Sequence, residues 1–380
     1  MCHFEAGKHT QAAIQTCHSQ TAVLSFPSKA FILLITQCGA LMWSTLPARA
    51  VPVLNVAFVG SEDLARSLAK LNDVRDIESY VHKEERGGVT SVLSVLRPLK
   101  HPETIRPLLS VLNVAEVGVV EIGVVDAALG EVLVSFGVSG IQKGIIIINP
   151  RDEGWVDSEQ VRTILTQAGL DSWVVYDSPP ESHELREELY AFMDNLDMDR
   201  EESSLILPVD QHFTVKGVGL VAIGYVQMGL VNKHDEVVIL PANEVGVVRS
   251  LQVMDDDVEV ARAGDRVGLA LRNLREEALH RGCMISHPDV GALARHDRSF
   301  LKLKEAPFQK RSLEVNDVIH AAVDLQFVVG RVMEIDGAKL MVTWESPIWI
   351  RRESLPTILI TQLDAHPMRV IGVVEEIEIL

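Results

Sequence analysis

The sequence predicts an α/β domain followed by two antiparallel β-barrels, and three observations lead to this fold class. Between residues 53 and 195, short runs rich in Val and Ile alternate with helix-like segments, a pattern typical of βαβ units around a mostly parallel sheet. Residues 195–204, "NLDMDREESS", are charged and contain few apolar residues. From residue 205 onward, short alternating strands are broken by glycines about every 8–12 residues, which is typical of antiparallel barrels.

The first domain is expected to contain five strands, at residues 53–59, 89–96, 116–126, 144–149 and 172–176. Helices are expected between them, at residues 62–72, 101–112, 128–136, 158–168 and 181–196. The segment "GIIIINP" (144–150) is the clearest central strand, because a near-continuous β-branched run is typical of a strand buried on both faces.

The second half is divided into two barrels on the same kind of evidence. Strands of the first barrel are expected at residues 213–216, 218–227, 236–240, 246–253 and 266–271. Strands of the second are expected at residues 321–329, 331–335, 339–343, 357–362 and 368–375. The predicted domains are therefore residues 51–197, 204–290 and 291–380, preceded by an N-terminal extension over residues 1–50 that is possibly not part of the fold.

The N-terminal extension holds an apolar stretch, Ala30–Trp43, that resembles the apolar region of a signal peptide and is followed by the small residues around Arg49. It lies behind 29 residues, however, and is shorter than the ~20 apolar residues of a spanning helix. The preferred interpretation is a segment that precedes the folded unit, with the true start nearer Met42. No membrane partner is expected.

Charge and cysteine content limit the classes of function. The formal net charge is −18. Residues 1–50 carry a net charge of +2, so residues 51–380 carry −20. Proteins that neutralise many phosphates are usually basic, so DNA binding and extensive RNA binding are disfavoured. Three of the four cysteines precede residue 40 and Cys283 stands alone, which indicates a reducing, cytoplasmic compartment. The 13 histidines show no spacing suited to a metal site.

The most informative stretch is residues 207–286, in which glycines and charged residues recur at fixed offsets. It opens with a Pro–acidic–x–x–Phe segment, continues with a Lys-Gly-x-Gly-x-Val-x-x-Gly run and an Ala-Gly-Asp-x-Val-Gly turn, and closes with Arg-Gly-x-x-Ile. The matching segments are Pro208–Phe213, Lys216–Gly224, Ala263–Gly268 and Arg281–Ile285. This spacing resembles the second domain of the translational GTPases, the family of elongation factor Tu, its archaeal counterpart elongation factor 1-alpha and the selenocysteine-specific factor SelB.

The resemblance implies that the first domain is a P-loop-NTPase-like G domain and that its strand ends carry nucleotide-binding residues. "VGSEDLARSL" (59–68) would be the phosphate loop, residues 83–93 a switch segment, and residues 149–152 the guanine-reading motif. The implied nucleotide-binding residues are Gly60, Asp63, Arg66, Ser67, Thr90, Asn149 and Asp152. Of these, Ser67 and Thr90 would contact a metal only if Mg²⁺-GTP binds; no other metal ligand is expected.

Several departures from the family pattern predict a degenerate G domain. Ala65 replaces a glycine that lets the loop close around phosphates, and Arg66 replaces the lysine that contacts them. The Asp-x-Pro-Gly-His motif that orients water is absent at residues 97–103, and Arg151 replaces the lysine that stacks on guanine. GTP hydrolysis depends on these parts, so the domain is expected to have no catalytic residue and to need no cofactor. Alternatively, the matching residues at strand ends are simply turn residues.

The leading hypothesis is a translation elongation factor-like protein that acts as a pseudo-GTPase scaffold. In the family, the second domain forms part of the pocket for the aminoacyl end of tRNA and contacts the ribosome. The resemblance therefore implies binding to a tRNA end, the ribosome or a translation factor. The alternatives are a divergent but active GTPase, in which Arg66 and Ser67 hold the phosphates of Mg²⁺-GTP, and a purely structural interaction module.

Overall fold

The computed structural model describes residues 52–150, 154–196, 202–288, 291–337 and 339–380, together with the backbone of four short strands nearer the N-terminus. Those strands form an antiparallel sheet in chain order: β1 Ala13–Thr16, β2 Thr21–Phe26, β3 Lys29–Ile35 and β4 Leu41–Thr45. The remainder of the predicted extension lies outside the described residues. A separate compact unit comprises Val53–Glu85 and Ser91–Leu380, and it holds the α/β domain and both barrels except for residues 86–90.

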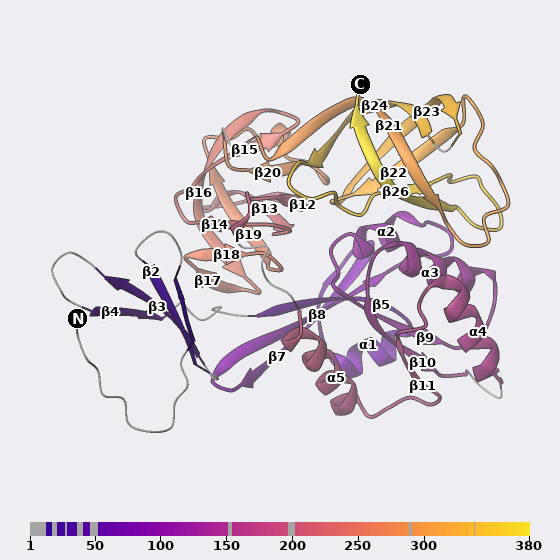
Figure 1. The fold of residues 1–380 in the computed structure, drawn as a ribbon, viewed down its shortest axis with the longest axis horizontal. Coiled ribbons are helices and arrows are strands. Elements are labelled where there is room, and N and C mark those ends of the chain that lie inside the picture. The colour runs from indigo at the N-terminus through magenta and orange to yellow at the C-terminus, as the bar shows by residue number, and fades with distance from the viewer. Residues whose placement is uncertain are drawn as a thin grey trace. The chain divides into compact units, whose positions relative to one another are not determined.

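The α/β domain is built on a seven-stranded sheet in the order β11-β10-β9-β5-β8-β7-β6 (Figure 1). Its strands are β5 Val53–Val59, β6 Lys70–Val74, β7 Ile77–Arg86, β8 Val89–Pro98, β9 Val117–Ile122, β10 Lys143–Ile148 and β11 Val174–Tyr176. The run from β11 to β8 is parallel throughout, whereas β6 pairs with β7 in antiparallel orientation. The predicted α/β fold with a mostly parallel sheet is therefore confirmed.

Helices cover both faces of this sheet. They are α1 Glu62–Leu68, α2 Arg106–Leu112, α3 Ala127–Val138, α4 Ser158–Ala168 and α5 Ser182–Asp194. Helices α1 and α5 pack on one face, and α2, α3 and α4 pack on the other. Local signals set their ends: the Asp126 side chain accepts the Leu129 N–H at the start of α3, and Gly169 ends α4 in the left-handed region with φ 79°.

Two predicted helices are shorter than the sequence pattern indicates. The helix expected over residues 62–72 ends at Leu68, and Lys70–Val74 forms strand β6 instead. The helix expected over residues 101–112 begins only at Arg106, with Pro107 in its first turn, where the missing N–H of proline has no intrahelical partner to lose. The first correction adds an antiparallel β6–β7 extension to the sheet that the sequence does not predict.

A pair of glycines on adjacent strands makes room for one large side chain. Gly118 of β9 lies opposite Gly144 of β10 in the parallel register, and the indole of Trp173 packs over both. A Cβ placed on either glycine would lie within 2.2–2.4 Å of a Trp173 ring atom. Trp173 is only 5% exposed and meets Phe136 of α3 edge to face, with ring centroids 5.3 Å apart. This indole therefore joins the sheet to the helix layer.

The first barrel is a ring of six strands in the order β15-β20-β12-β13-β19-β16. The ring closes because the last strand, β16, also pairs with the first, β15. Strand β17 extends this sheet, and β14 and β18 form a separate pair. The strands are β12 Leu207–Val215, β13 Gly219–Tyr225, β14 Leu230–Asn232, β15 Glu236–Leu240, β16 Glu244–Val253, β17 Asp256–Val258, β18 Val260–Arg262, β19 Arg266–Arg272 and β20 Met284–Ser286. A short 3₁₀ helix, Glu276–Ala278, precedes β20.

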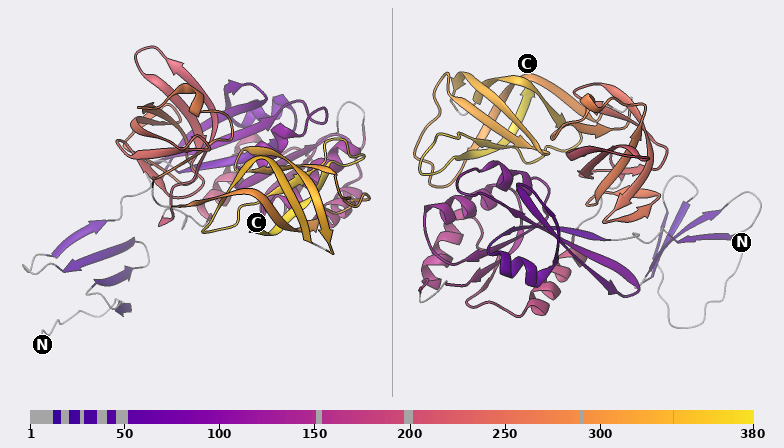
Figure 2. Two further views of the ribbon diagram at one scale, coloured as in Figure 1. Left: turned by 90° about the horizontal axis from the view of Figure 1, so that it is seen from above. Right: turned by 180° about the vertical axis from the view of Figure 1, so that it is seen from behind.

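The second barrel is a closed ring in the order β21-β24-β23-β22-β25-β26, and it lies beside the first barrel (Figure 2). Its strands are β21 Leu293–Glu305, β22 Val318–Val323, β23 Gln326–Asp336, β24 Lys339–Arg351, β25 Leu359–Thr361 and β26 Val370–Ile379. The predicted succession of two antiparallel barrels is confirmed.

The single strand expected over residues 321–329 is wrong. Strand β22 ends at Val323 and β23 begins at Gln326, because Asp324 and Leu325 form a tight turn with positive φ angles of 44° and 59°. No glycine marks the turn. Both Asp324 carboxylate oxygens instead accept hydrogen bonds from Arg351 of β24, and Asp324 is only 1% exposed. The buried ion pair between Asp324 and Arg351 therefore stabilises the turn at residues 324–325. The continuous apolar sequence around these residues gives no sign of this turn.

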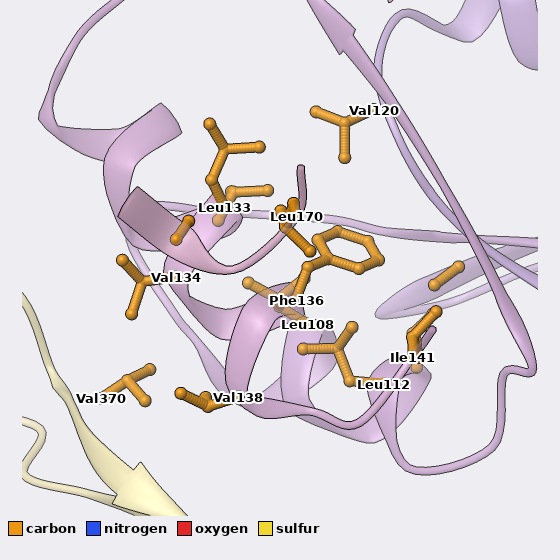
Figure 3. Close-up of a cluster of buried hydrophobic side chains, with 14 of the residues drawn as sticks. Leu108, Leu112, Val120, Leu133, Val134, Phe136, Val138, Ile141, Leu170 and Val370 are labelled. Carbon is orange, nitrogen blue, oxygen red and sulfur yellow. The ribbon is translucent and has the colours of Figure 1, made fainter. Parts of the chain in front are cut away.

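The main hydrophobic core extends beyond the α/β domain. Figure 3 shows Val370 of β26 beside Val134 and Val138 of α3, in the same buried cluster as Leu108 of α2. Met368 and Leu359 of the second barrel belong to this cluster too, so one core is shared between the two domains.

Within the described residues, no helix is long and apolar enough to cross a membrane.

Candidate functional site

The carboxyl ends of β5, β9 and β10 meet at one edge of the sheet, where ligands bind in open α/β sheets. Gly60 follows β5 and Asn149 follows β10, so the structure brings these two predicted residues to the same edge. Between them, on β9, lies Glu121. Glu121 is not among the site residues predicted from the sequence, although a single carboxylate inside the apolar run "VGVVEIG" is a signal that could have identified it.

Glu121 joins the two strand ends through its carboxylate. One oxygen accepts the backbone N–H of Ser61 at 2.5 Å, and the other accepts the side-chain amide of Asn149 at 2.6 Å. A Cβ on Gly60 would lie 2.8 Å from the Glu121 Cβ, so glycine is required for this close approach. The side-chain amide of Asn149 therefore donates to the Glu121 carboxylate of the protein itself.

Helix α1 starts immediately after Gly60, which determines where Arg66 and Ser67 lie. The Ser61 side chain accepts the Leu64 N–H as N-cap, so residues 62–68 are already helical. Arg66 therefore lies in the last turn, where it pairs with Glu62 and remains about half exposed. The Ser67 hydroxyl donates to the carbonyl of Leu64. Neither residue lines the pocket at the strand ends.

The remaining predicted residues are distributed unevenly. Asp63 is exposed and lines the strand-end pocket. Thr90 lies near the start of β8. It belongs to the compact unit of residues 1–52 and 86–90, whereas the rest of β8 belongs to the unit that holds the pocket. Asp152 lies outside the described residues.

The strand-end pocket has a volume of about 690 Å³ and is mainly acidic. Glu62, Asp63 and Glu121 line it, and Arg97 is its one basic lining residue among the described residues. Arg97 donates to the Gly60 carbonyl at 2.8 Å and to the Glu78 carboxylate at 2.7 Å, so its charge is already paired.

Glu78 connects this pocket to the buried Tyr80 below it. The Tyr80 hydroxyl donates to the same Glu78 oxygen at 2.7 Å. Burial, together with the hydrogen bond and negative charge of Glu78, raises the pKa of Tyr80 to about 12. Tyr80 therefore stays a neutral donor, and Glu78 and Arg97 are held in one orientation. Within the described residues, no group of three or more His, Cys, Asp or Glu side chains could hold a metal ion.

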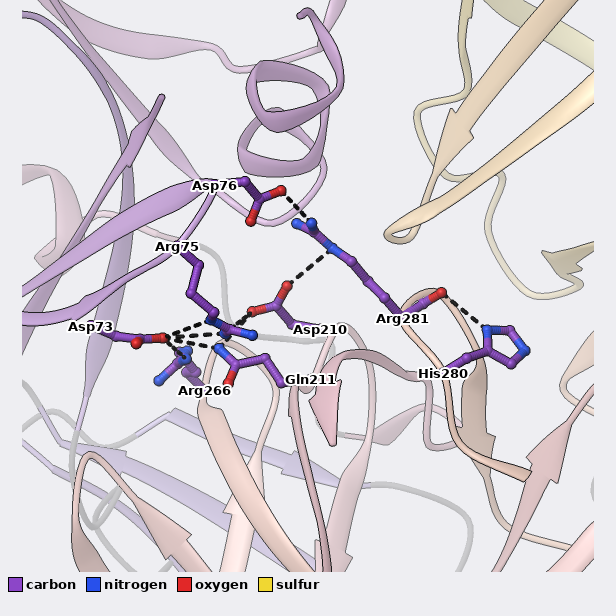
Figure 4. Close-up of polar contacts among 8 residues, drawn as sticks. All are labelled: Asp73, Arg75, Asp76, Asp210, Gln211, Arg266, His280 and Arg281. Carbon is purple, nitrogen blue, oxygen red and sulfur yellow. Dashed lines mark hydrogen bonds and ion pairs between the residues drawn. The ribbon is translucent and has the colours of Figure 1, made fainter. Parts of the chain in front are cut away.

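Two of the family-like residues of the first barrel, Asp210 and Arg281, contact the α/β domain. Figure 4 shows Arg281 between Asp210 of β12 and Asp76 of the β6–β7 turn, with Asp73 nearby contacting Gln211. Asp210 and Arg281 belong to two segments that carry the sequence resemblance, and they form an ion pair with each other. Burial raises the pKa of Asp210, and the positive charges of Arg281, Arg266 and Arg75 act in the opposite direction.

A second contact between the same domains comes from the centre of the sheet. Asn55 of β5 is 1% exposed, and its side-chain amide donates to the carbonyl of Gly264 at 2.9 Å. Gly264 belongs to the Ala-Gly-Asp turn of the barrel. A small cavity of about 20 Å³ lies between β6, β7 and the barrel strands.

Comparison with known proteins supports the assignment made from the sequence. The family described as Elongation factor Tu domain 2 matches residues 219–286. The selenocysteine-specific elongation factor of Methanocaldococcus jannaschii is 36% identical over 151 residues, which are 40% of this chain and 32% of that protein. Residues 219–286 thus belong to the family of Elongation factor Tu domain 2, and the chain as a whole is similar to translational GTPases. It is therefore a translation elongation factor-like protein.

Two further proteins show how far the similarity extends. The uncharacterized protein MJ0325 of Methanocaldococcus jannaschii is 28% identical over 288 residues, covering 76% of this chain and 88% of that protein. SelB of Methanococcus maripaludis, in complex with the GTP analogue GppNHp, superposes with a TM-score of 0.70 at 21% identity, over 86% of this chain and 80% of that one. At this identity the superposition establishes the shared fold.

Proposed function

We propose that this chain is a pseudo-GTPase of the translational GTPase family: its α/β domain neither binds nor hydrolyses GTP, and it acts as a scaffold for a protein component of the translation machinery. The observation that carries the proposal is the carboxylate of Glu121, which accepts the backbone N–H of Ser61 at the start of α1.

Electrostatics at the strand ends oppose a nucleotide. A phosphate-binding loop presents free backbone N–H groups and a lysine to the β- and γ-phosphates. Here the first such N–H is taken by Glu121, and Glu62 and Asp63 follow at once. A carboxylate about 4 Å from a phosphate charge costs on the order of 4 kcal/mol at an effective dielectric constant of 20. Mg²⁺-GTP therefore does not fit the residues present.

The early start of α1 supports the same conclusion. A phosphate loop needs several non-helical residues to wrap around the phosphates before its lysine and serine. Only Gly60 and Ser61 separate β5 from α1. Arg66 forms its ion pair with Glu62 on the helix surface.

A titration with fluorescent GTP in the presence of Mg²⁺ tests the proposal. We expect no saturable signal at micromolar protein, because the phosphate position is occupied by Glu121. SelB of Methanococcus maripaludis, whose structure holds the GTP analogue GppNHp, is the positive control. Micromolar affinity that is lost in Arg66→Ala would refute the scaffold proposal and favour the divergent GTPase in which Arg66 and Ser67 hold the phosphates.

Charge and contacts favour a protein partner over tRNA. Residues 51–380 carry a net charge of −20, which repels a polyanion. In addition, Asp210 and Arg281, which belong to the segments that resemble the family, are engaged with each other and with the α/β domain. An acidic scaffold is electrostatically complementary to a basic protein surface.

Filter binding of aminoacyl-tRNA at several salt concentrations distinguishes the two kinds of partner. We expect weak retention with no saturation at 100 mM salt. Tight binding whose affinity falls linearly with salt on logarithmic axes would identify tRNA as the ligand instead, because that slope counts the phosphate charges neutralised.

A further inference from the structure

The turn between β22 and β23 places Leu325 at the junction of all three domains. Leu325 belongs to the second barrel, yet it is only 3% exposed and lies in the buried cluster that forms the core of the α/β domain. It also borders the small cavity between the α/β domain and the first barrel, which Val114 of the former and Tyr225 of the latter line as well. One side chain of the second barrel therefore lies between the other two domains.

The backbone of the same turn contacts the first barrel. A Cβ placed on Gly282 would lie 3.0 Å from the Leu325 carbonyl oxygen and 3.2 Å from the Cα of Gln326, so this approach is close. The preceding residue, Arg281, is ion-paired with Asp76 of the β6–β7 turn. The turn, the first barrel and the α/β domain thus contact one another in succession.

Leu325 holds a backbone conformation that leucine rarely adopts. Its φ is 59°, and that of Asp324 is 44°. In this left-handed region the Cβ crowds the following carbonyl, so two-residue turns of this kind usually contain Asn and Gly. Such strain persists only where the surrounding structure over-determines it. The side chain of Leu325 therefore supplies a contact that glycine would not.

The first barrel is held to the α/β domain largely by polar groups. Four hydrogen-bonded or ionic contacts join them: Gln211 with Asp73, Arg281 with Asp76, Asn55 with Gly264, and Lys83 with Asp256. A polar interface between domains permits relative motion unless apolar contacts oppose it.

The second barrel is joined differently to each of its neighbours. It shares the large core cluster with α3, so the α/β domain and the second barrel form one body. It meets the first barrel in a small apolar cluster that includes Met284 and Leu293, close to the segment where the chain passes from one barrel to the other. That segment has the position of a hinge about which the first barrel would turn.

We infer that the side chain of Leu325 is an interdomain wedge that holds the first barrel closed against the α/β domain, so that the three domains keep one arrangement. The ion pair of Asp324 with Arg351 fixes the wedge to the second barrel. Removing the wedge leaves the polar contacts to hold the first barrel, and the barrel then turns about its connection to the second. This inference does not depend on whether the α/β domain binds GTP.

Double electron–electron resonance between spin labels on the full chain tests the inference. Cys2, Cys17 and Cys38 are first replaced by serine, and the buried Cys283 is kept.

Two label pairs separate the two interfaces. Glu187→Cys with Val245→Cys spans the α/β domain and the first barrel, and Glu187→Cys with Met333→Cys spans the α/β domain and the second barrel. All three positions are exposed. We expect one narrow distance distribution for each pair when Leu325 is present.

Leu325→Gly removes the wedge and relieves the backbone strain. We expect it to widen the distribution of the Glu187/Val245 pair about twofold or more, while the Glu187/Met333 pair keeps its width because the shared core holds it. Leu325→Met, which keeps a large apolar side chain, is expected to behave as the parent does. Asn316→Gly is the matched control, because Asn316 is an exposed turn residue of the same barrel with φ 76°. It relieves strain without removing the wedge and is expected to change neither width.

Three results would overturn the inference. They are a broad or two-peaked Glu187/Val245 distribution in the parent, an unchanged width in Leu325→Gly, and equal widening in Asn316→Gly, which would indicate general loosening of the second barrel. Thermal unfolding of each variant shows whether it is folded. Should Leu325→Gly fail to fold, Leu325→Ala takes its place with the same expectation, and an unchanged width there would contradict the inference equally.

Discussion

Replacing Arg369 by alanine is expected to destabilise the folded chain by about 3–5 kcal/mol, because the change leaves a buried carboxylate without its main partner. Glu131 of α3 is 4% exposed and accepts both the backbone N–H and the guanidinium of Arg369, which precedes β26. His101 supplies a further hydrogen bond at 3.0 Å. Chemical denaturation of parent and variant measures the loss. Arg295→Ala, which removes an exposed ion pair with Asp297, is the control and is expected to change little.

The same ion pair predicts a pH dependence. Burial alone raises the pKa of Glu131, but the hydrogen bonds from His101 and Arg369 outweigh it and lower the pKa to about 2, below its ordinary value of 4.5. The stabilisation is therefore complete above about pH 4.5 and is lost as the pH falls towards 2. In Arg369→Ala the stability should fall less steeply across this window. An unchanged slope would show that Arg369 does not hold the carboxylate ionised.

The second large effect is expected at the glycine pair under Trp173. Gly118→Val should cost about 1–3 kcal/mol or more, because its Cβ alone would lie 2.2 Å from the indole. Trp173→Ala should cost about 3–5 kcal/mol through loss of a buried aromatic side chain. The double variant should be less destabilised than the sum of the two, since removing the indole makes room for the valine. Denaturant midpoints of the four proteins measure this coupling.

Gly130→Ala is the matched control, because a Cβ at this position in α3 meets no atom within 4 Å. Alanine should there stabilise the helix by about 0.5–1 kcal/mol, the opposite sign to Gly118→Val. Additive losses in Gly118→Val and Trp173→Ala would contradict the proposed contact.

Periodicity and glycine spacing were enough to predict the fold. The run at residues 144–149 is strand β10, and the helix expected over residues 158–168 coincides with α4, since a capping Asp and a left-handed Gly mark its ends. The resemblance of residues 207–286 agrees with the comparisons. These features are local or repeat at fixed offsets, so a single sequence records them.

Features set by contacts between distant residues could not be predicted in this way. The turn at Asp324 depends on Arg351 of another strand. The candidate site depends on Glu121, whose partners Ser61 and Asn149 lie 60 and 28 positions away in the chain. A phosphate loop starting at Gly60 would also require the residues after it to be non-helical. In the structure, Ser61 is the N-cap of α1, so the helix begins directly after Gly60. Local pattern cannot reveal which donors a carboxylate meets after folding.

The core shared by α3 and β26 has a consequence for folding during synthesis. The α/β domain is complete in sequence by residue 196, yet Val134 and Val138 remain uncovered until Met368 and Val370 leave the ribosome. Domains usually fold as units while the chain emerges. In this chain the first domain keeps an apolar face open during translation of both barrels, so ribosome-bound chains that stop before residue 368 should be the species that chaperones bind and proteases cut.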